Sequence, residues 1–491
     1  MYKRKKVRFV ASSDIKRRER ILKGNLIQAV LFICLPLAVY QLFNSAYNLI
    51  DQIICAQIST TAQNAVSSIG QLKNAISAFG GGLAAGGAVF ISRFYGAGKV
   101  KDAKHASANL LFLSIVLSII LIILLVPLAK PIMQLCQIAP ESIEIGVGFF
   151  RLQLLELAFI GINNVFIGLE KAKGNSKSIL KLNLLVLAVK MAFTCLFIFG
   201  FKLSDIIYVE IATIIGQAVL TGIGVVVLFG KNNILQISLK NIFPKKEYIV
   251  PILKYSIPIF FGKFIMSMGK VVVNGLCGNY WNAATDGLIV GTLGVSNNIC
   301  GVITSPTNTF EEGESTIVSQ NLGNKNLKRA VKTFSRTLLL VGSISIVGYV
   351  LMRFVLIDHL VELFTSSDKL SDTYKVMVKE IFKYDSLSIL ALGFTAAVLG
   401  LLYGFGKTGL STVLNFSRIG SRIVILIFLH NVFPDLAPTT CAGLSMAISN
   451  TIILLLSLTF LIIFFINLKK KGYKGMSLAD PEPEVSELVL D

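Results

Sequence analysis

The segment VFISRFYGAGKVKDA, residues 89–103, recurs later in the chain as TIVSQNLGNKNLKRA, residues 316–330. Each copy follows an apolar run and carries a glycine before a basic stretch, and the two copies align Gly96 with Gly323. Self-similarity at a long, fixed interval is the signature of an internal repeat. The pair therefore predicts that the chain is built from two related halves.

A second pair of segments supports the same division. GLEKAKGNS at 168–176 aligns with GLLYGFGKT at 400–408, and beyond it Lys190 aligns with Arg422. Both halves begin on the same side of the membrane with an even number of spans, so we expect a parallel repeat related by an axis along the membrane normal. Substrate sites in such folds lie between the halves.

The composition predicts an all-α polytopic membrane protein. Hydrophobic residues make up 54% of the 491 residues and charged residues only 15%, and apolar runs repeatedly reach the roughly 20 residues that a spanning helix needs. The net charge of +20 does not indicate a nucleic-acid partner, because the Lys and Arg residues lie in the terminal segments and in short loops.

Twelve apolar runs are long enough to span a membrane. We expect helices at about 25–53, 64–94, 107–134, 141–169, 178–200, 204–229, 251–278, 285–319, 333–363, 373–404, 409–432 and 438–467. The expected organisation is a basic cytoplasmic segment 1–24, a first lobe 25–229, a cytoplasmic linker 230–250, a second lobe 251–468 and a cytoplasmic polar tail 469–491.

Alternate loops are basic, which predicts that both termini lie in the cytoplasm. The basic N-terminal stretch is followed by a full-length span rather than by a short signal-peptide core, so the first span is expected to act as the insertion signal. We expect a multi-pass protein of a bacterial plasma membrane, monomeric and surrounded by membrane lipids.

One carboxylate interrupts the first span. Asp51 lies in AYNLIDQIICAQI, residues 46–58, where a central charge costs roughly 2.5 to 3.5 kcal/mol on insertion scales. An intramembrane charge is by default a candidate for function.

Other charges inside the spans are candidates for the wall of a substrate cavity. They are Arg151, Glu156, Lys73, Lys263, Asp385, Glu311 and Glu314. In helical projection Glu311 and Glu314 share a face, whereas Glu312 points about 100° away from Glu311. The repeat places Ala84, Ala85 and Gly87 opposite this cluster, so the two halves are chemically unequal. An alternative is that the cluster is only a cytoplasm-facing helix end.

Enzymatic sites are poorly supported by the sequence. GFGKT at 404–408 lacks the glycine that a phosphate-binding loop requires five residues before Gly406, and the three histidines have no paired spacing. We therefore expect no cofactor, and neither a nucleophile–base pair nor a filter-like channel loop is evident.

Five segments together resemble the multidrug and toxic compound extrusion (MATE) family of the multidrug/oligosaccharidyl-lipid/polysaccharide flippase superfamily, across about residues 25 to 470. They are NLIDQIICAQI (48–58), ISRFYGAGKVKDA (91–103), GLEKAKGNSK (168–177), VSQNLGNKNLKRA (318–330) and GLLYGFGKTG (400–409). The resemblance implies two six-helix lobes in a V shape, and export of amphiphilic, often cationic, small molecules driven by an inward H⁺ or Na⁺ gradient.

The resemblance also implies a coupling site in the first lobe. The family's N-x-x-D pattern falls on Asn48 and Asp51, and its fifth-span Asn and Asp fall on Lys190 and Thr194. The second acid of the usual pair is therefore replaced, and we expect Lys190 close to Asp51. Two alternatives stay open: a permanent ion pair between these residues, and a flippase of a lipid-linked saccharide.

Overall fold

The fold is described from a computed structural model that covers residues 2–58, 60–136, 138, 140–203, 205–364 and 372–471. Within these ranges the side chains of 2–12, 48, 49, 51–53, 55–58, 60–65, 67, 68, 142, 239, 363, 364 and 471 are left out of the description. The described chain is helical, with no strand in these ranges.

A first helix, α1 (Tyr2–Lys23), precedes the spans. The N-lobe then contains α2 (Leu26–Ile58), α3 (Thr60–Ala97), α4 (Val100–Leu125), α5 (Ala129–Leu135), α6 (Pro140–Ala172), α7 (Ser176–Cys195) and α8 (Ile206–Phe229). The C-lobe contains α9 (Lys246–Trp281), α10 (Ile289–Gly323), α11 (Leu327–Val350), α12 (Ile357–Phe364), α13 (Asp372–Asp385), α14 (Leu387–Gly404), α15 (Gly409–Val432) and α16 (Pro438–Lys471).

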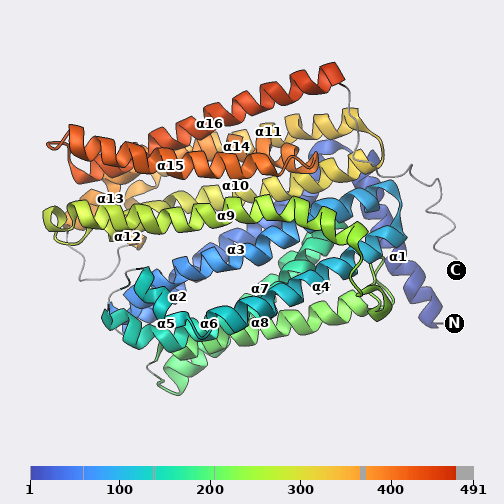
Figure 1. Ribbon diagram of the computed structural model, residues 1–491, viewed down its shortest axis with the longest axis horizontal. Coiled ribbons are helices and arrows are strands. Elements are labelled where there is room, and N and C mark those ends of the chain that lie inside the picture. The colour runs from blue at the N-terminus through green and yellow to red at the C-terminus, as the bar shows by residue number, and fades with distance from the viewer. Residues whose placement is uncertain are drawn as a thin grey trace.

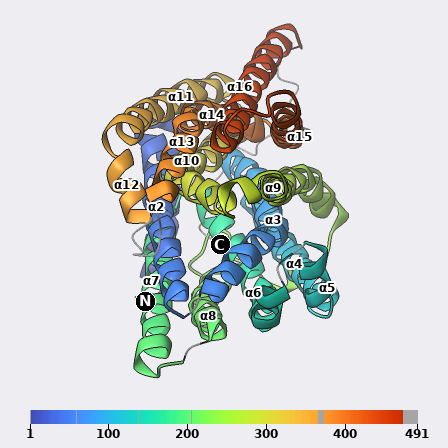
Figure 2. The same ribbon diagram turned by 90° about the vertical axis from the view of Figure 1, so that its left-hand side faces the viewer.

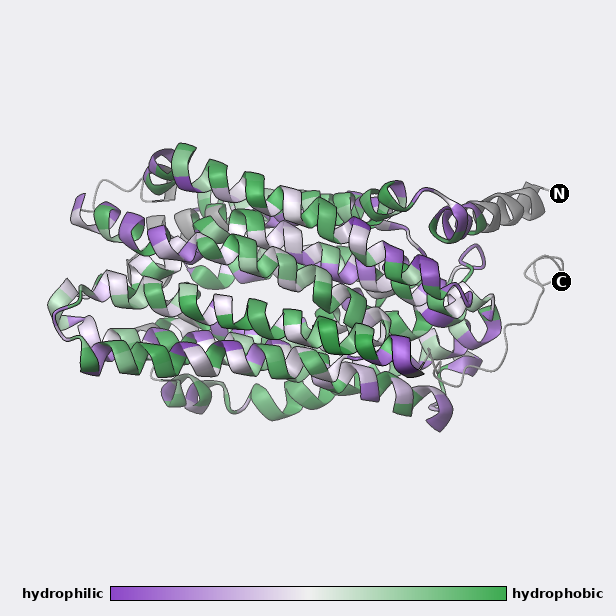
Figure 3. Ribbon diagram, turned by 90° about the horizontal axis from the view of Figure 1, so that it is seen from above, coloured by the Kyte–Doolittle hydropathy of each residue, from purple (hydrophilic) through white to green (hydrophobic). Residues whose placement is uncertain are grey.

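Eleven helices in the described part of the chain are long and apolar enough to cross a membrane. The expected eighth span, α10, is 35 residues long but is not among them, because it carries many polar residues. It packs against α2 and α3 of the N-lobe and α14 of the C-lobe, so its polar residues are shielded from lipid. Figure 3 shows hydrophobic residues along the helices and hydrophilic residues gathered toward the end where α1 lies.

Several spans differ from the sequence-based expectation at their ends. The third ends at Leu125, and the short helix α5 follows it. The tenth is broken between α13 and α14 at Ser386. The N-terminal basic segment, for which no helix was expected, forms α1.

The two lobes meet along α3 and α9 and along α2 and α10 (Figures 1 and 2). These two pairs are equivalent under the repeat, since α2 corresponds to α9 and α3 to α10. The lobes therefore contact each other through symmetry-related helices.

The closest approach between the lobes lies where α3 and α10 cross, at the end of the bundle that carries α1. A Cβ on Gly96 would lie 2.1 Å from the carbonyl oxygen of Gln320, and a Cβ on Gly323 would lie 2.1 Å from that of Arg93. No side chain fits at either position without a shift of backbone. The aligned glycines thus close the interface between the lobes at this end.

Helix α1 bridges both lobes at the same end. Arg18 donates hydrogen bonds to the carbonyl oxygens of Tyr95 and Gly96 on α3, both at 2.8 Å. Arg329 on α11 donates to the carbonyl oxygens of Ile21 at 2.9 Å and Gly24 at 2.6 Å. Burial lowers the pKa of the Arg18 guanidinium from its ordinary value, yet arginine stays charged in proteins. The helix is thereby fixed to the N-lobe and to the C-lobe.

Candidate functional site

A cavity of about 190 Å³ lies between the lobes, near the closed end. Residues of α3, α6, α9, α10 and α14 line it, so both lobes contribute to its wall. Its charged residues are Lys171 from the N-lobe and Lys263, Glu311 and Glu312 from the C-lobe. Two positive and two negative side chains therefore face one small space.

Glu312 connects the lobes through this cavity. Its carboxylate pairs with the ammonium of Lys171 on α6, and its Oε1 lies 3.5 Å from Nζ of Lys263 on α9. The side chain of Glu312 is 32% exposed, so the ion pair is accessible. A charged substrate can compete for either partner, which makes this pair a candidate for coupling substrate binding to separation of the lobes.

The other two carboxylates of the cluster have different surroundings. Glu311 lines the cavity and interacts with the hydroxyl of Tyr403 on α14. Glu314 is fully buried, and neither of its carboxylate oxygens has a hydrogen-bond partner in the described part of the chain. It lies close to Gly400 on α14. Of the two predicted cavity residues, Glu311 lines this cavity and Glu314 does not, and Glu312 lines it beside Glu311.

Sequence reasoning missed Lys171, Tyr403 and the role of Glu312, although the repeat contains the signal. Lys171 aligns with Tyr403 in the pair GLEKAKGNS and GLLYGFGKT, and both residues line the cavity. Ala84 and Ala85, the equivalents of Glu311 and Glu312, line it as well. Equivalent positions meet here because the cavity lies on the repeat axis.

Lys73 and Glu156 belong to a separate cluster inside the N-lobe. The Lys73 ammonium pairs with Glu156 and lies 3.4 Å from Oε1 of Glu210 on α8. Gln153 donates from Nε2 to Oε2 of Glu210 at 3.2 Å. Neither Lys73 nor Glu156 lines the inter-lobe cavity, because their partners hold both side chains between α3, α6 and α8.

The expected coupling site falls partly outside the described residues. The side chains of Asn48 and Asp51 are not described, so the expected proximity of Asp51 to Lys190 remains a prediction. The Lys190 ammonium lies 4.3 Å from the ring centroid of Tyr47, and Tyr47 and Asp51 are four residues apart on one face of α2. Thr194 is fully buried on α7.

Arg151 and Asp385 also lie away from the inter-lobe cavity. Arg151 is exposed on α6. Asp385 is buried in the C-lobe, where its carboxylate accepts hydrogen bonds from Ser296 at 3.3 Å and from Ser388 at 2.9 Å.

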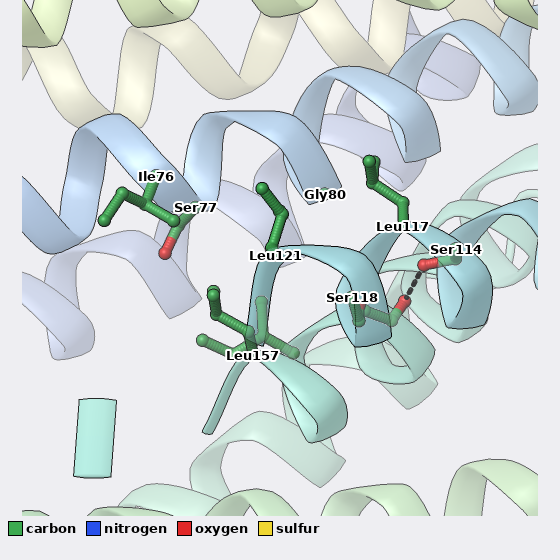
Figure 4. Close-up of a pocket in the computed structure, with 10 residues that line it drawn as sticks. Ile76, Ser77, Gly80, Ser114, Leu117, Ser118, Leu121 and Leu157 are labelled. Atoms are coloured by element: carbon green, nitrogen blue, oxygen red, sulfur yellow. Dashed lines mark hydrogen bonds between the residues drawn. The ribbon is translucent and has the colours of Figure 1, made fainter. Parts of the chain in front are cut away.

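A second cavity lies inside the N-lobe, between α3, α4 and α6 (Figure 4). Its volume is about 10 Å³, which is near the lower limit for one water molecule. Ser114 in its wall donates to the carbonyl oxygen of Gly161 at 2.9 Å. This cavity is too small for an organic substrate.

The MatE family model matches residues 36–196 and 258–428, one segment in each lobe. The chain belongs to the MatE family. The resemblance seen in the sequence is therefore confirmed, and with it the assignment as a membrane transporter rather than an enzyme.

Two curated relatives of this MATE chain are multidrug export proteins named MepA. The protein of Staphylococcus haemolyticus is 23% identical over 443 residues, which cover 87% of this chain and 94% of the relative. The protein of Staphylococcus saprophyticus is 23% identical over 201 residues, which cover 40% of this chain and 44% of the relative.

Solved structures confirm the two-lobe MATE fold. A multidrug resistance MATE family transporter in an outward-facing conformation has a TM-score of 0.84 at 17% identity, with coverage of 92% of this chain and 98% of the other. A MOP superfamily transporter from Pyrococcus furiosus, reported with a binding pocket of reversed polarity, has a TM-score of 0.83 at 18% identity and the same coverage.

Proposed function

We propose that this MATE chain exports amphiphilic, cationic organic compounds from a bacterial cell in exchange for H⁺ or Na⁺. The observation that supports this function best is the inter-lobe cavity, where Glu311 and Glu312 face the transport route and Glu312 pairs with Lys171 of the opposite lobe. A cationic substrate that binds Glu312 releases Lys171 and weakens the link between the lobes.

The end of the molecule at which α3 and α10 cross supports a direction for transport. If the termini are cytoplasmic, as the basic loops predict, the crossing at Gly96 and Gly323 separates the cavity from the cytoplasm. In the described conformation the lobes are then closed together on the cytoplasmic side. Export requires a second conformation in which this crossing separates.

Coupling is assigned to Asp51, with Asn48, Lys190 and Thr194 around it. Binding of a proton or a sodium ion neutralises a buried carboxylate and changes how its helix packs. The position of Lys190 against the Tyr47 face of α2 supports this site. Substrate and coupling ion are then bound at different places in the chain.

Dye transport in everted membrane vesicles tests the proposal. Ethidium uptake should follow an imposed proton or sodium gradient and cease when that gradient is dissipated. Uptake that is independent of both gradients, or absent under both, contradicts the proposal. Glu312→Gln should reduce uptake about tenfold, and Lys407→Gln, a change of one charge at an exposed loop position, is the matched control.

A flippase of a lipid-linked saccharide is the second candidate function. Lys171 and Lys263 in the cavity wall favour it, because ammonium groups bind the phosphate groups of such lipids. Movement of a fluorescent lipid phosphate across vesicles without an ion gradient, together with no ethidium uptake, distinguishes it from export.

A further inference from the structure

The C-lobe holds three basic side chains that the proposed cationic substrate does not require. Lys270 lies on α9, and Arg418 and Arg422 lie one turn apart on α15, which packs against α9. The ammonium of Lys270 is close enough to both guanidinium groups for their charges to act on it. We call these three residues the basic cluster.

Neutral groups hold the two arginines of the basic cluster. Arg418 donates from Nε to Oδ1 of Asn450 on α16 at 2.7 Å. Arg422 donates from Nε to Oγ of Ser449 at 3.1 Å and from a terminal nitrogen to Asn450 at 3.4 Å. An amide and a hydroxyl orient the guanidinium groups but leave their charge uncompensated.

Within the described ranges no carboxylate forms an ion pair with the basic cluster. Among the described carboxylates, Asp385 is the one whose charge acts on it, and serine hydroxyls donate hydrogen bonds to that carboxylate. Three positive groups and one negative group leave an excess of positive charge in a membrane-embedded lobe. Such charge is costly unless it is paired.

Lys270 is the exposed member of the basic cluster, whereas Arg422 is 3% exposed behind it. Lys270 is exposed and lies about two helical turns after Lys263 on the same face of α9, and Lys263 lines the inter-lobe cavity. Figure 1 shows α9 beside α3, at the boundary of the lobes. The face of α9 that lines the cavity near the closed end therefore continues to Lys270.

We propose that the basic cluster binds the anionic head group of an amphiphile, a phosphate, sulfonate or carboxylate on an apolar body. Guanidinium groups bind such oxyanions through paired hydrogen bonds, and an ammonium group adds a further donor. Beside Lys270 on α9, the apolar side chain of Val272 is 46% exposed. The site thus combines three cationic side chains with an exposed apolar side chain next to Lys270.

Paired amphiphiles of opposite charge test the site on the purified full-length chain in a nonionic detergent. Octyl phosphate should raise the unfolding temperature saturably, whereas octyltrimethylammonium should not do so through this site. Lys270→Gln should require about tenfold more octyl phosphate for the same shift. Lys407→Gln should respond like the unmodified chain, because it removes the same charge from an exposed loop.

Two results would overturn the proposal: an unchanged octyl phosphate response in Lys270→Gln, or equal stabilisation by the cationic amphiphile. Arg418→Lys provides an independent variant that keeps the charge and removes the fork of donors. It should weaken octyl phosphate binding several-fold. Wild-type octyl phosphate affinity in Arg418→Lys would likewise overturn the proposal.

Competition experiments distinguish a free anionic solute from a lipid head group as the natural ligand of the site. Displacement of octyl phosphate by orthophosphate supports a site that takes a free anionic solute. Loss of the octyl phosphate response in phosphatidylglycerol nanodiscs, but not in phosphatidylcholine nanodiscs, supports a lipid head group. If neither competes, the octyl chain alone drives binding and the proposal is wrong.

This inference rests on the proposal that the inter-lobe cavity is part of the transport route, but the two proposals fail separately. Octyl phosphate binding without ethidium export would remove only the export function. Ethidium export without octyl phosphate binding would remove only the anion site.

Discussion

In the N-lobe, Lys73 pairs with Glu156 and lies 3.4 Å from Glu210. In the C-lobe, Lys270, Arg418 and Arg422 have Asp385 as their only acidic neighbour and form no ion pair in the described part of the chain. In the N-lobe, the cation and the carboxylates of the cluster compensate one another. In the C-lobe, the positive charge of the basic cluster is left for a ligand to compensate. The difference assigns structural stability to the first cluster and ligand binding to the second.

The repeat shows that these clusters occupy related places. Aligning GLEKAKGNS with GLLYGFGKT also places Gln153 opposite Asp385 and Lys190 opposite Arg422. In the N-lobe the carboxylates come from α6 and α8, whereas in the C-lobe the cations come from α9 and α15. A shared backbone thus carries side chains of opposite net charge in its two halves.

The largest effect is expected from removing the first-lobe acid. Asp51→Asn should abolish gradient-driven export and leave the protein in the membrane, because an amide retains the shape of the side chain but cannot exchange a proton. Asp385→Asn should retain gradient dependence and change only the apparent affinity for substrate. Ion flux and ethidium flux are measured together in vesicles. Gradient dependence kept by Asp51→Asn and lost by Asp385→Asn would place coupling in the C-lobe.

A large difference in stability is expected between the two lysines. Lys73→Met should lower the free energy of unfolding by about 3–5 kcal/mol, because it leaves Glu156 and Glu210 without their cation. Lys270→Met should change it by less than about 1 kcal/mol, because its ammonium has no ion pair to lose. Unfolding in mixed micelles with increasing dodecyl sulfate measures both.

A charge-neutral variant of the N-lobe cluster is the control for that comparison. Lys73→Met combined with Glu156→Gln and Glu210→Gln should recover most of the lost stability, because no buried charge remains unpaired. Equal losses for Lys73→Met and Lys270→Met would show that the lobes do not differ in the way described.

The fold was largely predictable from the sequence, and the reason is physical. A membrane span imposes length and apolarity, and a repeat imposes topology, so twelve spans in two halves follow from local patterns. The eighth span, expected as an apolar run at 285–319, corresponds to α10 (Ile289–Gly323) although its polar residues keep it outside the eleven apolar spans. The break at Ser386 and helix α1 depend on tertiary contacts, such as those of Arg18 with Tyr95 and Gly96, which no local pattern contains.

The candidate site was predictable only in part. Lys263 and the acidic cluster of Glu311, Glu312 and Glu314 were identified as intramembrane charges, and all of these except Glu314 line the cavity. The ion pair between Lys171 and Glu312 was not predicted. It joins residues of different lobes, and the sequence does not show how the two lobes pack against each other. Lys73 and Glu156 were predicted to line the cavity. Charge alone does not indicate whether a side chain faces the inter-lobe cavity or the interior of its own lobe.

The contact between α3 and α10 at Gly96 and Gly323, the glycine crossing, is a feature to which both lobes contribute equally. Gly96→Ala and Gly323→Ala should have equal effects, since each Cβ would lie 2.1 Å from a backbone carbonyl oxygen. Overpacking of about 1–3 kcal/mol should favour separation at the α1 end. Gly70→Ala on α3 and Gly294→Ala on α10, with nothing within 4 Å of the added Cβ, are the matched controls.

Cysteine reactivity measures that separation. Ser319→Cys, at a fully buried position in a background without the seven native cysteines, should react with maleimide at least about tenfold faster in the two crossing variants than in the controls. A response to Gly96→Ala alone would mean that the crossing does not follow the repeat.

The smallest expected difference concerns the neutral donors to one carboxylate in each lobe. Gln153 donates to Glu210 at 3.2 Å, and Ser296 donates to Asp385 at 3.3 Å, so the two bonds have nearly the same length. Gln153→Met should cost about 1 kcal/mol, because Lys73 remains beside Glu210. Ser296→Ala should cost about 2 kcal/mol, because hydroxyl donors replace an ion pair at Asp385.

Ser343→Ala, whose hydroxyl is on an exposed helix face, should change stability by less than about 0.5 kcal/mol. The same micelle unfolding assay resolves the order, and a larger loss for Gln153→Met than for Ser296→Ala would show that the cations of the basic cluster, rather than the hydroxyls, compensate Asp385.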